Sequence, residues 1–279
     1  MTIGILGSGS VAAAMCRALS ADHIVLWARD AERGAVLAAE CGAEFEPELA
    51  ALTQAASLIL CVRDDAIAEV ASRLAAELGT PPSGAAVFHT SGFHSADVLA
   101  PLAARGWQTG SLHPLISMPP GVRAELKGGW FAIDGTPAAR VRATELISVV
   151  GGHVLKLSTD ADARQRYHAA AALVANGLVA LLDAALETLG DAAPEAEARA
   201  AFAELAQGVF RNVTEHGTAA SLTGPAARGE AELVAGHLAL LGPEARAIYV
   251  ALTRRMLQLA EERGTLGAQA RRAIESALG

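Results

Sequence analysis

The stretch Thr2-Ile3-Gly4-Ile5-Leu6-Gly7-Ser8-Gly9-Ser10-Val11-Ala12 decides the fold of this chain. It begins as an apolar, strand-like run and ends by opening a helix-like stretch that continues to Leu19. Gly7 allows the tight turn between the two, and Gly9 lets the backbone come close to a pyrophosphate. Ala12 is small enough for the helix to pack on the strand, so that the helix N-terminus faces the phosphates. The pattern predicts a dinucleotide-binding loop; the alternative is a tight turn that holds no ligand.

The end of the second strand predicts which dinucleotide binds. The strand His23–Trp27 is followed by Ala28, Arg29 and Asp30. A site for NAD carries a carboxylate at this place, about 20 residues after the glycines, to bind the ribose hydroxyls. Ala28 stands there instead, and the guanidinium of Arg29 suits the 2′-phosphate of NADP. We therefore expect NADP rather than NAD, although Arg29 could also be a solvated surface charge. Asp30 is expected to cap the next helix.

Strand and helix patterns alternate along residues 1–157. The apolar run Ser57–Val62 is typical of a buried parallel strand. Further strands are expected at Ala85–Phe88, Gln108–Leu112, Trp130–Ile133 and Val154–Leu157. This alternation predicts an α/β fold, a Rossmann doubly wound parallel sheet whose ligand lies at the carboxyl ends of the strands. The residues expected to bind the cofactor lie in the first loop and at the ends of the later strands: Gly7, Ser8, Gly9, Ser10, Val11, Arg29, Val62 and Ser91.

The pattern changes near Ser158. From there to the end, Ala, Leu and Glu recur with helical spacing and no strand pattern remains. Helices are expected at Asp160–Leu189, Glu195–Glu215, Glu230–Leu240, Pro243–Glu262 and Gly267–Leu278. The sequence thus predicts an NADP-binding Rossmann domain over residues 1–157, followed by an all-α domain for substrate binding and dimerisation over residues 158–279.

The composition argues against several function classes. The net charge is −8 and no basic cluster is present, so nucleic acid is not an expected partner. Cys16, Cys41 and Cys61 lie scattered in apolar segments, which indicates small core residues rather than a disulfide or a metal site. No signal peptide is expected, because the first strand begins at once. The stretch Ala169–Leu182, which contains Asn176, is expected to be too short for a bilayer and to be a buried helix of a cytoplasmic protein with no membrane partner.

Two polar segments are expected at the carboxyl edge of the sheet. The segment Phe88-His89-Thr90-Ser91-Gly92 follows a buried strand directly, and its hydroxyls and glycine suit a ribose or a ring. A capped strand–helix turn is the alternative. His113 ends the next strand and is fixed by Pro114, which makes it a candidate proton donor to a carbonyl or imine group. A purely structural histidine is the alternative there.

Two further polar segments lie in the helical part. His168, Asn176 and Asp183 fall on one stripe of an otherwise apolar helix, at about 100° per residue. Buried polar groups need partners, which here are either another helix or a substrate in a cleft between the domains. In a later glycine- and proline-rich loop, Thr223 offers a hydroxyl, and Arg228 offers a bidentate fork that suits a substrate carboxylate. An ordinary helix–helix connection is the alternative. The residues expected at the catalytic site are therefore His113, His168, Asn176, Thr223 and Arg228.

These segments together resemble known families. The N-terminal half resembles the Rossmann domains of pyrroline-5-carboxylate reductase, the deazaflavin-dependent NADP reductases and ketopantoate reductase. The whole chain resembles a bacterial family of Rossmann-like oxidoreductases with a helical C-terminal domain of unassigned function. The motifs that carry the resemblance are Gly7–Ala12, His113-Pro114-Leu115, Tyr167-His168-Ala169 with Asn176, Leu222–Pro225 and Ala227–Gly229.

The resemblance implies an NADP-dependent oxidoreductase that transfers hydride to a small carbonyl or imine compound, with an anionic 2-oxo acid of the ketopantoate type as one option. It also implies a homodimer built through the helical domain. Ketopantoate reductases place a catalytic lysine four residues before a helical asparagine; if Asn176 matches that asparagine, Ala172 stands at the lysine position. The proton donor would then be His168, His113 or a water. Two alternatives are a non-catalytic NADP(H)-binding redox sensor and an enzyme of another chemistry that uses the cofactor only structurally.

Overall fold

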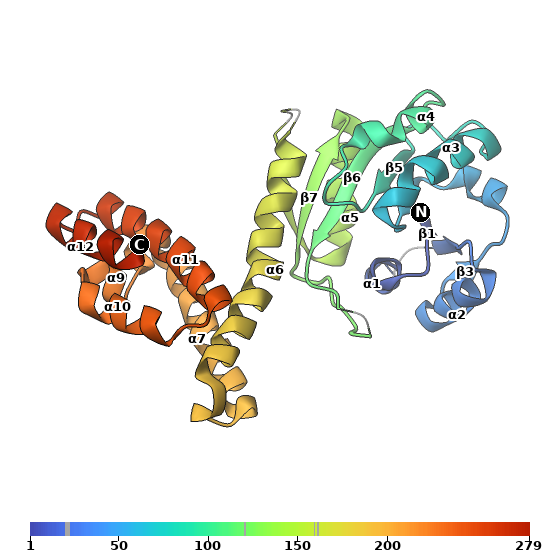
Figure 1. Cartoon of the computed structure of the whole chain (residues 1–279). Helices are drawn as coiled ribbons and strands as arrows, with labels where there is room; N and C mark the ends of the chain where they lie inside the picture. Colours follow the sequence, from blue (N-terminus) through green and yellow to red (C-terminus); the bar gives the residue numbers. More distant parts are fainter. Residues whose placement is uncertain (20–22, 120, 159, 161) are drawn as a thin grey trace. The chain divides into compact units, whose positions relative to one another are not determined.

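The computed structural model describes residues 1–19, 23–119, 121–158, 160 and 162–279 (Figure 1). The chain divides into two units, Met1–Ala172 and Leu173–Gly279. The strands lie in the first unit, and the described residues of the second unit are in helices and turns.

The apolar runs of the sequence form the sheet of the first unit. In its described residues the sheet has eight strands, in the order β3-β2-β1-β4-β5-β6-β7-β8. Neighbouring strands are parallel except for β6 and β7, which are antiparallel. The strands are β1 (Thr2–Leu6), β2 (His23–Trp27), β3 (Glu44–Phe45), β4 (Ser57–Leu60), β5 (Ala86–His89), β6 (Gln108–Leu115), β7 (Trp130–Gly135) and β8 (His153–Lys156). Because β1, β4, β5 and β6 are parallel, their carboxyl ends share one edge of the sheet.

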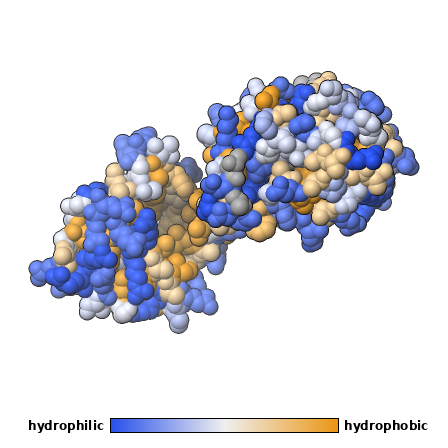
Figure 2. All heavy atoms as spheres, turned by 90° about the horizontal axis from the view of Figure 1, so that it is seen from above, coloured by the Kyte–Doolittle hydropathy of each residue, from blue (hydrophilic) through white to orange (hydrophobic). Residues whose placement is uncertain are grey.

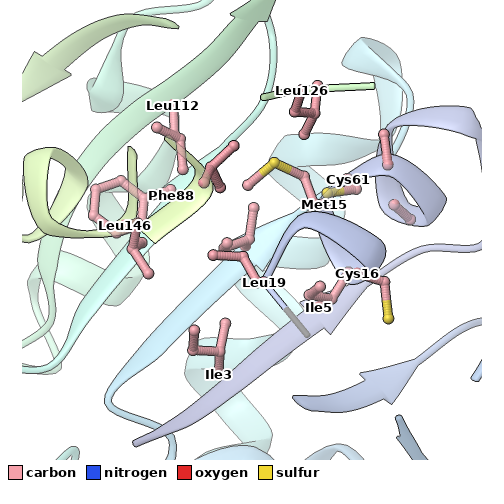
Figure 3. Packing of buried hydrophobic residues seen from close by; sticks show 14 of the residues in the cluster. Ile3, Ile5, Met15, Cys16, Leu19, Cys61, Phe88, Leu112, Leu126 and Leu146 are labelled. Carbon is pink, nitrogen blue, oxygen red and sulfur yellow. The ribbon is translucent and has the colours of Figure 1, made fainter. Parts of the chain in front are cut away.

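Helices cover both faces of this sheet, because successive side chains of a buried strand point to opposite faces. Ile3, Ile5 and Ile59 pack with α1, α2 and α5 on one face, as Figure 3 shows in part. Leu58 and Leu60 pack with α3 and α4 on the other. The helices and 3₁₀ turns of this unit are α1 (Ser10–Ala18), α2 (Ala31–Cys41), η1 (Leu49–Gln54), η2 (Asp64–Ala66), α3 (Ile67–Glu77), η3 (Ala96–Leu99), α4 (Ala100–Ala103) and α5 (Pro137–Val150).

The helical unit has a small core of its own. Helix α6 (Ala163–Leu189) begins in the first unit and continues into the second. The elements that follow are η4 (Gly190–Ala192), α7 (Glu195–His216), α8 (Thr218–Ser221), α9 (Pro225–Arg228), α10 (Ala231–Leu240), α11 (Pro243–Glu262) and α12 (Ala268–Leu278). Buried apolar side chains of α10, α11 and α12 form the core: Val234, Leu238, Leu257, Ile274 and Leu278.

The predicted fold class is confirmed, with three differences in detail. Strand β3 was not predicted, because a two-residue strand leaves no alternating pattern. Strand β7 is antiparallel to β6, so the sheet is mixed rather than wholly parallel. The two units meet after Ala172 rather than after residue 157. The first turn of α6 belongs to the first unit because Arg164 is buried against the sheet.

The apolar helix α6 differs from the expectation in the length of its apolar part and in its burial. Over residues 163–192 its most apolar 18-residue window has a mean hydropathy of 1.9, and none of that window is buried within the chain. By length and composition alone this segment could cross a membrane, and a single helix of this kind is weak evidence that it does. The helix itself was predicted at Asp160–Leu189, but the prediction that its apolar part is too short for a bilayer and buried was wrong. Hydropathy does not tell whether the same chain supplies the surface that covers an apolar helix.

Candidate active site

The glycine loop after β1 has the geometry that a dinucleotide requires. Gly7 has a φ of +130°, and a Cβ at this position would lie 2.3 Å from the carbonyl oxygen of Cys61, so only glycine fits. Its amide donates to the carbonyl oxygen of Trp27 at 2.8 Å, which joins the loop to the end of β2. Ala12 is fully buried, as close packing of α1 on β1 demands.

The N-terminus of α1 is open to a ligand. Its N-cap residue is Gly9, which makes no side-chain cap, and no acidic residue lies in the first turn. A Cβ on Gly9 would meet nothing within 4 Å. A cavity of about 730 Å³ adjoins this turn and is lined in part by Ser8, Gly9, Ser10 and Arg33. Uncapped amides at a positive helix end, with space above a glycine, fit the pyrophosphate of a dinucleotide.

Cationic side chains lie exposed beyond the end of β2. Arg29 is exposed, and its charge helps to lower the pKa of Asp65, whose main partner is Arg63. Asp30 accepts the amide of Arg33 at 3.1 Å, which confirms it as the N-cap of α2. The exposed Arg33 thus lies in the first turn of α2, at the same end of the helix as Arg29. The sequence interpretation missed Arg33; a second cation four residues after Arg29 was the signal.

Ser91 builds the loop after β5 rather than offering a free hydroxyl. Its Oγ donates to Asp64 at 2.8 Å and accepts the amides of Phe93 and His94 at 3.0 and 3.1 Å. The Ser91 side chain is nearly buried, at 4% exposure. Val62 is partly buried and packs on the core. The cofactor roles of both residues stay predictions, and for Ser91 the hydroxyl already has its partners.

His89, the last residue of β5, holds the same loop by hydrogen bonds. Its Nδ1 accepts the amide of Ser91 at 3.2 Å, so its Nε2 carries the proton and donates to the carbonyl oxygen of Ser95 at 3.1 Å. Burial is the main reason that the pKa of His89 falls to about 3, and the nearby charge of Arg164 adds to it. His89 is therefore a neutral structural histidine.

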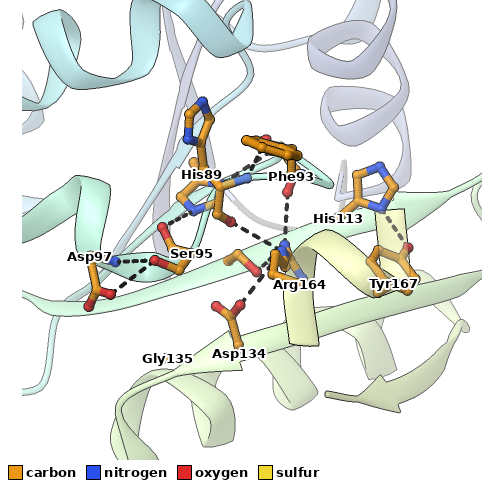
Figure 4. Close-up of polar contacts among 12 residues, drawn as sticks. His89, Phe93, Ser95, Asp97, His113, Asp134, Gly135, Arg164 and Tyr167 are labelled. Carbon is orange, nitrogen blue, oxygen red and sulfur yellow. Dashed lines mark hydrogen bonds and ion pairs between the residues drawn. The ribbon is translucent and has the colours of Figure 1, made fainter. Parts of the chain in front are cut away.

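Arg164 ties the first turn of α6 to the sheet (Figure 4). Only 3% of its side chain is exposed. Its Nη2 donates to the carbonyl oxygen of Ser91 at 2.8 Å and to the Oγ of Ser111, and its Nε donates to the carbonyl oxygen of His94 at 3.1 Å. Its Nε also lies 3.6 Å from a carboxylate oxygen of Asp134 on β7. One buried cation thus fixes the loop after β5, strand β6 and α6 together.

His113, Tyr167 and His168 gather around Gly92. His113 lies beyond the end of β5, because β6 continues past Ser111, the last residue that it pairs with β5. Its Nδ1 is 2.7 Å from the hydroxyl of Tyr167. A Cβ on Gly92 would lie 2.9 Å from Nε2 of His113 and 2.7 Å from Nδ1 of His168. The two imidazoles therefore approach the loop where only a glycine leaves room for them.

Burial sets the protonation states of this group. It lowers the pKa of His113 to about 4, with Arg164 and His168 lowering it further and Asp64 opposing them. It raises the pKa of Tyr167 to about 12, against the influence of Arg164. At neutral pH His113 is thus a neutral imidazole next to a protonated phenol. Such a group can donate or accept a hydrogen bond without carrying charge.

The other expected catalytic residues lie in the helical unit. Asn176 and Thr223 are exposed, and their side chains make no hydrogen bond among the described residues. Arg228 forms a two-pronged pair with Glu230, with N–O distances of 2.8 and 2.7 Å. The fork expected for a substrate carboxylate is therefore occupied by a carboxylate of the same loop. The expected cleft between the domains stays a prediction.

Two residues of this group escaped the sequence interpretation. Tyr167 is not among the catalytic residues expected from the sequence, because it faces away from Asn176 on a helical projection, yet it contacts His113, 54 positions earlier in the chain. Arg164 left no signal, since one arginine in a polar helix start is ordinary. Among the described residues, no group of three or more His, Cys, Asp or Glu side chains is placed to hold a metal ion.

Comparisons with known proteins agree with this architecture. Residues 1–114 match a family described as a Rossmann-like domain, and residues 129–256 match one described as a domain of unknown function, DUF2520. These matches confirm the resemblance, stated above from the sequence motifs, to proteins that combine a Rossmann domain with a helical domain of unassigned function. No curated protein matches the chain.

Solved structures with a similar fold include several reductases. A Bacteroides fragilis protein described as a candidate NADP oxidoreductase has a TM-score of 0.71 at 22% identity, covering 92% of this chain and 98% of its own. Pyrroline-5-carboxylate reductase of Coxiella burnetii has a TM-score of 0.65 at 15% identity, with coverages of 99% and 96%. A reductive aminase of Aspergillus terreus, solved with NADPH and ethyl-5-oxohexanoate, has a TM-score of 0.63 at 16% identity, with coverages of 99% and 98%. At these identities the similarity is one of fold.

Proposed function

We propose that this chain, which joins a Rossmann-like domain to a DUF2520 domain, is an NADP-dependent oxidoreductase that reduces a small carbonyl or imine compound. One observation carries the proposal. The open N-terminus of α1 and the group around His113 lie at the same carboxyl edge of the sheet, because the strands that lead to them are parallel. Open α/β sheets bind their ligands at this edge.

The residues that would hold NADP follow from the loop geometry. The amides at Gly9 and Ser10 would bind the pyrophosphate, and Arg29 and Arg33 would bind the 2′-phosphate. The absence of an acid directly after β2 supports NADP over NAD, since Ala28 is apolar and buried and Asp30 caps α2. When bound, the reduced dinucleotide supplies a hydride to the substrate carbon.

His113 is the proton donor that the geometry favours. Ala172 offers no lysine, whereas Nε2 of His113 faces the space beside Gly92. His168 shares that space, and its ring lies edge-on to Phe93 with 6.1 Å between centroids. We assign proton donation to His113, because the hydroxyl of Tyr167 contacts its Nδ1 and leaves Nε2 for the substrate. We assign substrate contact to His168.

An anionic substrate group would need a cationic anchor. We propose that Arg228 takes this role by exchanging Glu230 for a substrate carboxylate, with Asn176 and Thr223 as further polar contacts. The pair with Glu230 is exposed, so little stability is lost when it opens.

We also propose that a second copy of the chain covers α6 and α7, which makes the protein a homodimer. Leu173 and Val179 on α6 are 77% and 70% exposed, and Leu205, Val209 and Phe210 on α7 are also exposed. Figure 2 shows hydrophobic side chains gathered on the surface of the helical unit. Exposed apolar surface on this scale marks an interface. Contact with protein rather than lipid agrees with the cytoplasmic location expected from the sequence.

Cofactor binding tests the proposal first. Titration calorimetry should give tighter binding of NADPH than of NADH. Arg29→Ala should weaken NADPH binding by about ten- to a hundred-fold, as expected for one charge-assisted contact of roughly 1.5–3 kcal/mol, and leave NADH binding nearly unchanged. Arg33→Ala should act in the same direction. Arg123→Ala, which removes an exposed arginine paired with Glu125, is the control. Equal affinities of the unmutated protein for the two cofactors would contradict the NADP assignment.

Turnover separates an enzyme from a sensor. NADPH oxidation should be measured against 2-oxo acids, aldehydes, ketones and cyclic imines. Reduction of any of these compounds supports the reductase, whereas tight NADPH binding without turnover favours the redox sensor.

Light scattering at micromolar concentration tests the dimer. A monomer of 28.5 kDa would refute it.

A further inference from the structure

The contact between His113 and Tyr167 separates two substrate classes that the proposed function leaves open. Figure 4 shows the two side chains pointing toward one another, His113 from β6 and Tyr167 from α6. The phenol oxygen lies 2.7 Å from Nδ1, and the rings meet edge to face with 5.7 Å between centroids. No other hydrogen bond of either side chain is recorded among the described residues. The outer nitrogen of His113, Nε2, thus remains for a ligand.

The surrounding charge sets the direction of this hydrogen bond. The guanidinium carbon of Arg164 lies 5.7 Å from the centre of the Tyr167 ring. A cation beside a phenol stabilises negative charge on its oxygen, which makes the hydroxyl the better donor. Tyr167 therefore donates to Nδ1 of His113, and the imidazole proton sits on Nε2. The proton points toward Gly92, on the side that His168 also approaches.

The same surroundings work against positive charge. Arg164 and His168 on α6 both oppose protonation of His113, while Asp64 in the turn after β4 favours it. His89 on β5 is neutral, and the charge of Arg164 opposes its protonation as well. The result is a pKa of about 4 for His113, well below its ordinary value. A substrate that carries positive charge next to His113 is destabilised by the same charges.

We propose that Tyr167 and His113 form a proton-donating pair that suits a neutral carbonyl substrate and disfavours an iminium ion; this rests on the reductase function proposed above. An imine accepts hydride well only when it is protonated, which places a cation beside His113. A carbonyl enters neutral and develops negative charge on oxygen during reduction. That charge is stabilised by the Nε2–H donor and by the positive field of Arg164.

The proton transfer balances with water as the final source of the proton. The hydride would come from the C–H bond that breaks in the reduced dinucleotide. As a C–H bond forms at the substrate carbon, the π electrons of the C=O bond move to oxygen. The oxygen takes the proton of Nε2, and Nδ1 takes the proton of the Tyr167 hydroxyl. The tyrosinate that remains is stabilised by Arg164. It takes its proton back from Nδ1 as Nε2 takes a proton from water, which restores the starting state. A phenol with a pKa of about 12 can protonate an alkoxide, which is a stronger base. His113 is thus the catalytic residue, and Tyr167 is the positioning residue behind it.

Nitrogen-15 NMR of the full-length protein tests the pair without any turnover. His113 is expected as the Nε2–H tautomer, titrating near pH 4. Tyr167→Phe should leave the protein folded and abolish the preference for this tautomer. Tyr249→Phe is the matched control, because Tyr249 makes the same kind of contact with His237, at 2.9 Å, in the helical unit. A proton on Nδ1 of His113, or titration above pH 6, would overturn the inference.

Kinetics with a matched pair of substrates test the class. Cyclopentanone and 1-pyrroline have rings of the same size, one with a C=O and the other with a C=N bond. The ketone should be reduced with the higher kcat/KM, and its kcat should stay level from pH 6 to pH 9. Tyr167→Phe should lower that kcat by about 10²-fold, with little change in KM. Tyr249→Phe should leave it unchanged.

The outcomes separate the two proposals. Faster reduction of 1-pyrroline, or a ketone kcat that Tyr167→Phe does not change, overturns the carbonyl assignment and leaves the reductase standing. NADPH binding with no turnover of either compound overturns the proton-donor assignment. Failure to bind NADPH refutes the proposed function itself, while the NMR result still decides how His113 is protonated.

Discussion

Replacing Arg164 by methionine should destabilise the first unit strongly. The substitution removes hydrogen bonds to the carbonyl oxygens of Ser91 and His94 and to the Oγ of Ser111. It also leaves Asp134, whose side chain is 14% exposed, without its cation. Removing one partner of a buried ion pair costs about 3–5 kcal/mol. For a unit of this size, each kcal/mol lowers Tm by about 2–4 °C, so Tm should fall by about 6–20 °C.

Calorimetry at pH 7 measures this loss, and two variants define its origin. Arg123→Met removes an arginine that pairs with Glu125 on the surface, where ion pairs contribute about 0–1 kcal/mol, and should change Tm little. Adding Asp134→Asn to Arg164→Met should restore part of the stability, because it removes the uncompensated buried charge. A loss below about 1 kcal/mol for Arg164→Met, or no recovery in the double variant, would refute the reasoning.

The same variant has an electrostatic consequence at His113. Burial is the largest cause of its lowered pKa and Arg164 is the second, so removing the cation should move the pKa upward from about 4. NMR titration of His113 in a folded Arg164→Met sample measures this shift. An unchanged titration would show that the guanidinium does not act on His113.

Two further predictions concern pH and the glycine loop. His89 and His113 have pKa values of about 3 and 4 in the folded chain, against 6.5 unfolded, so the unfolded state binds protons first as the pH falls. Stability should be complete above about pH 6.5 and lost progressively down to about pH 3, and equal urea midpoints at pH 7 and pH 4.5 would contradict this. Gly7→Ala should destabilise the protein, since its Cβ would lie 2.3 Å from the carbonyl oxygen of Cys61. A Cβ at Gly9 has space, so Gly9→Ala should keep the stability while weakening NADPH binding. Thermal scans measure the stability of the two variants and calorimetry measures their NADPH affinity; equal stability losses would contradict the geometry.

The sequence by itself determined the local structure and the position of the cofactor edge. The glycine loop could be predicted because the need for glycine at positions 7 and 9 comes from the backbone geometry of the loop itself. Helix α11 was predicted with its observed bounds, Pro243–Glu262, because proline at the start of a helix and periodic apolar residues are signals within a short stretch. The N-cap role of Asp30 was equally local, since the cap and its amide lie three residues apart.

Only the tertiary structure decided which side chains meet at the site. Tyr167 contacts His113 across 54 positions, and Arg164 contacts the carbonyl oxygen of Ser91 across 73. Both contacts depend on where the first turns of α6 pack on the sheet, and no periodicity within α6 records that packing. The exposure of Leu173 and its apolar neighbours could not be predicted either, because it also depends on how α6 packs. A sequence pattern reports that a face is apolar, but the surface that covers this face is supplied by other parts of the fold or by another molecule.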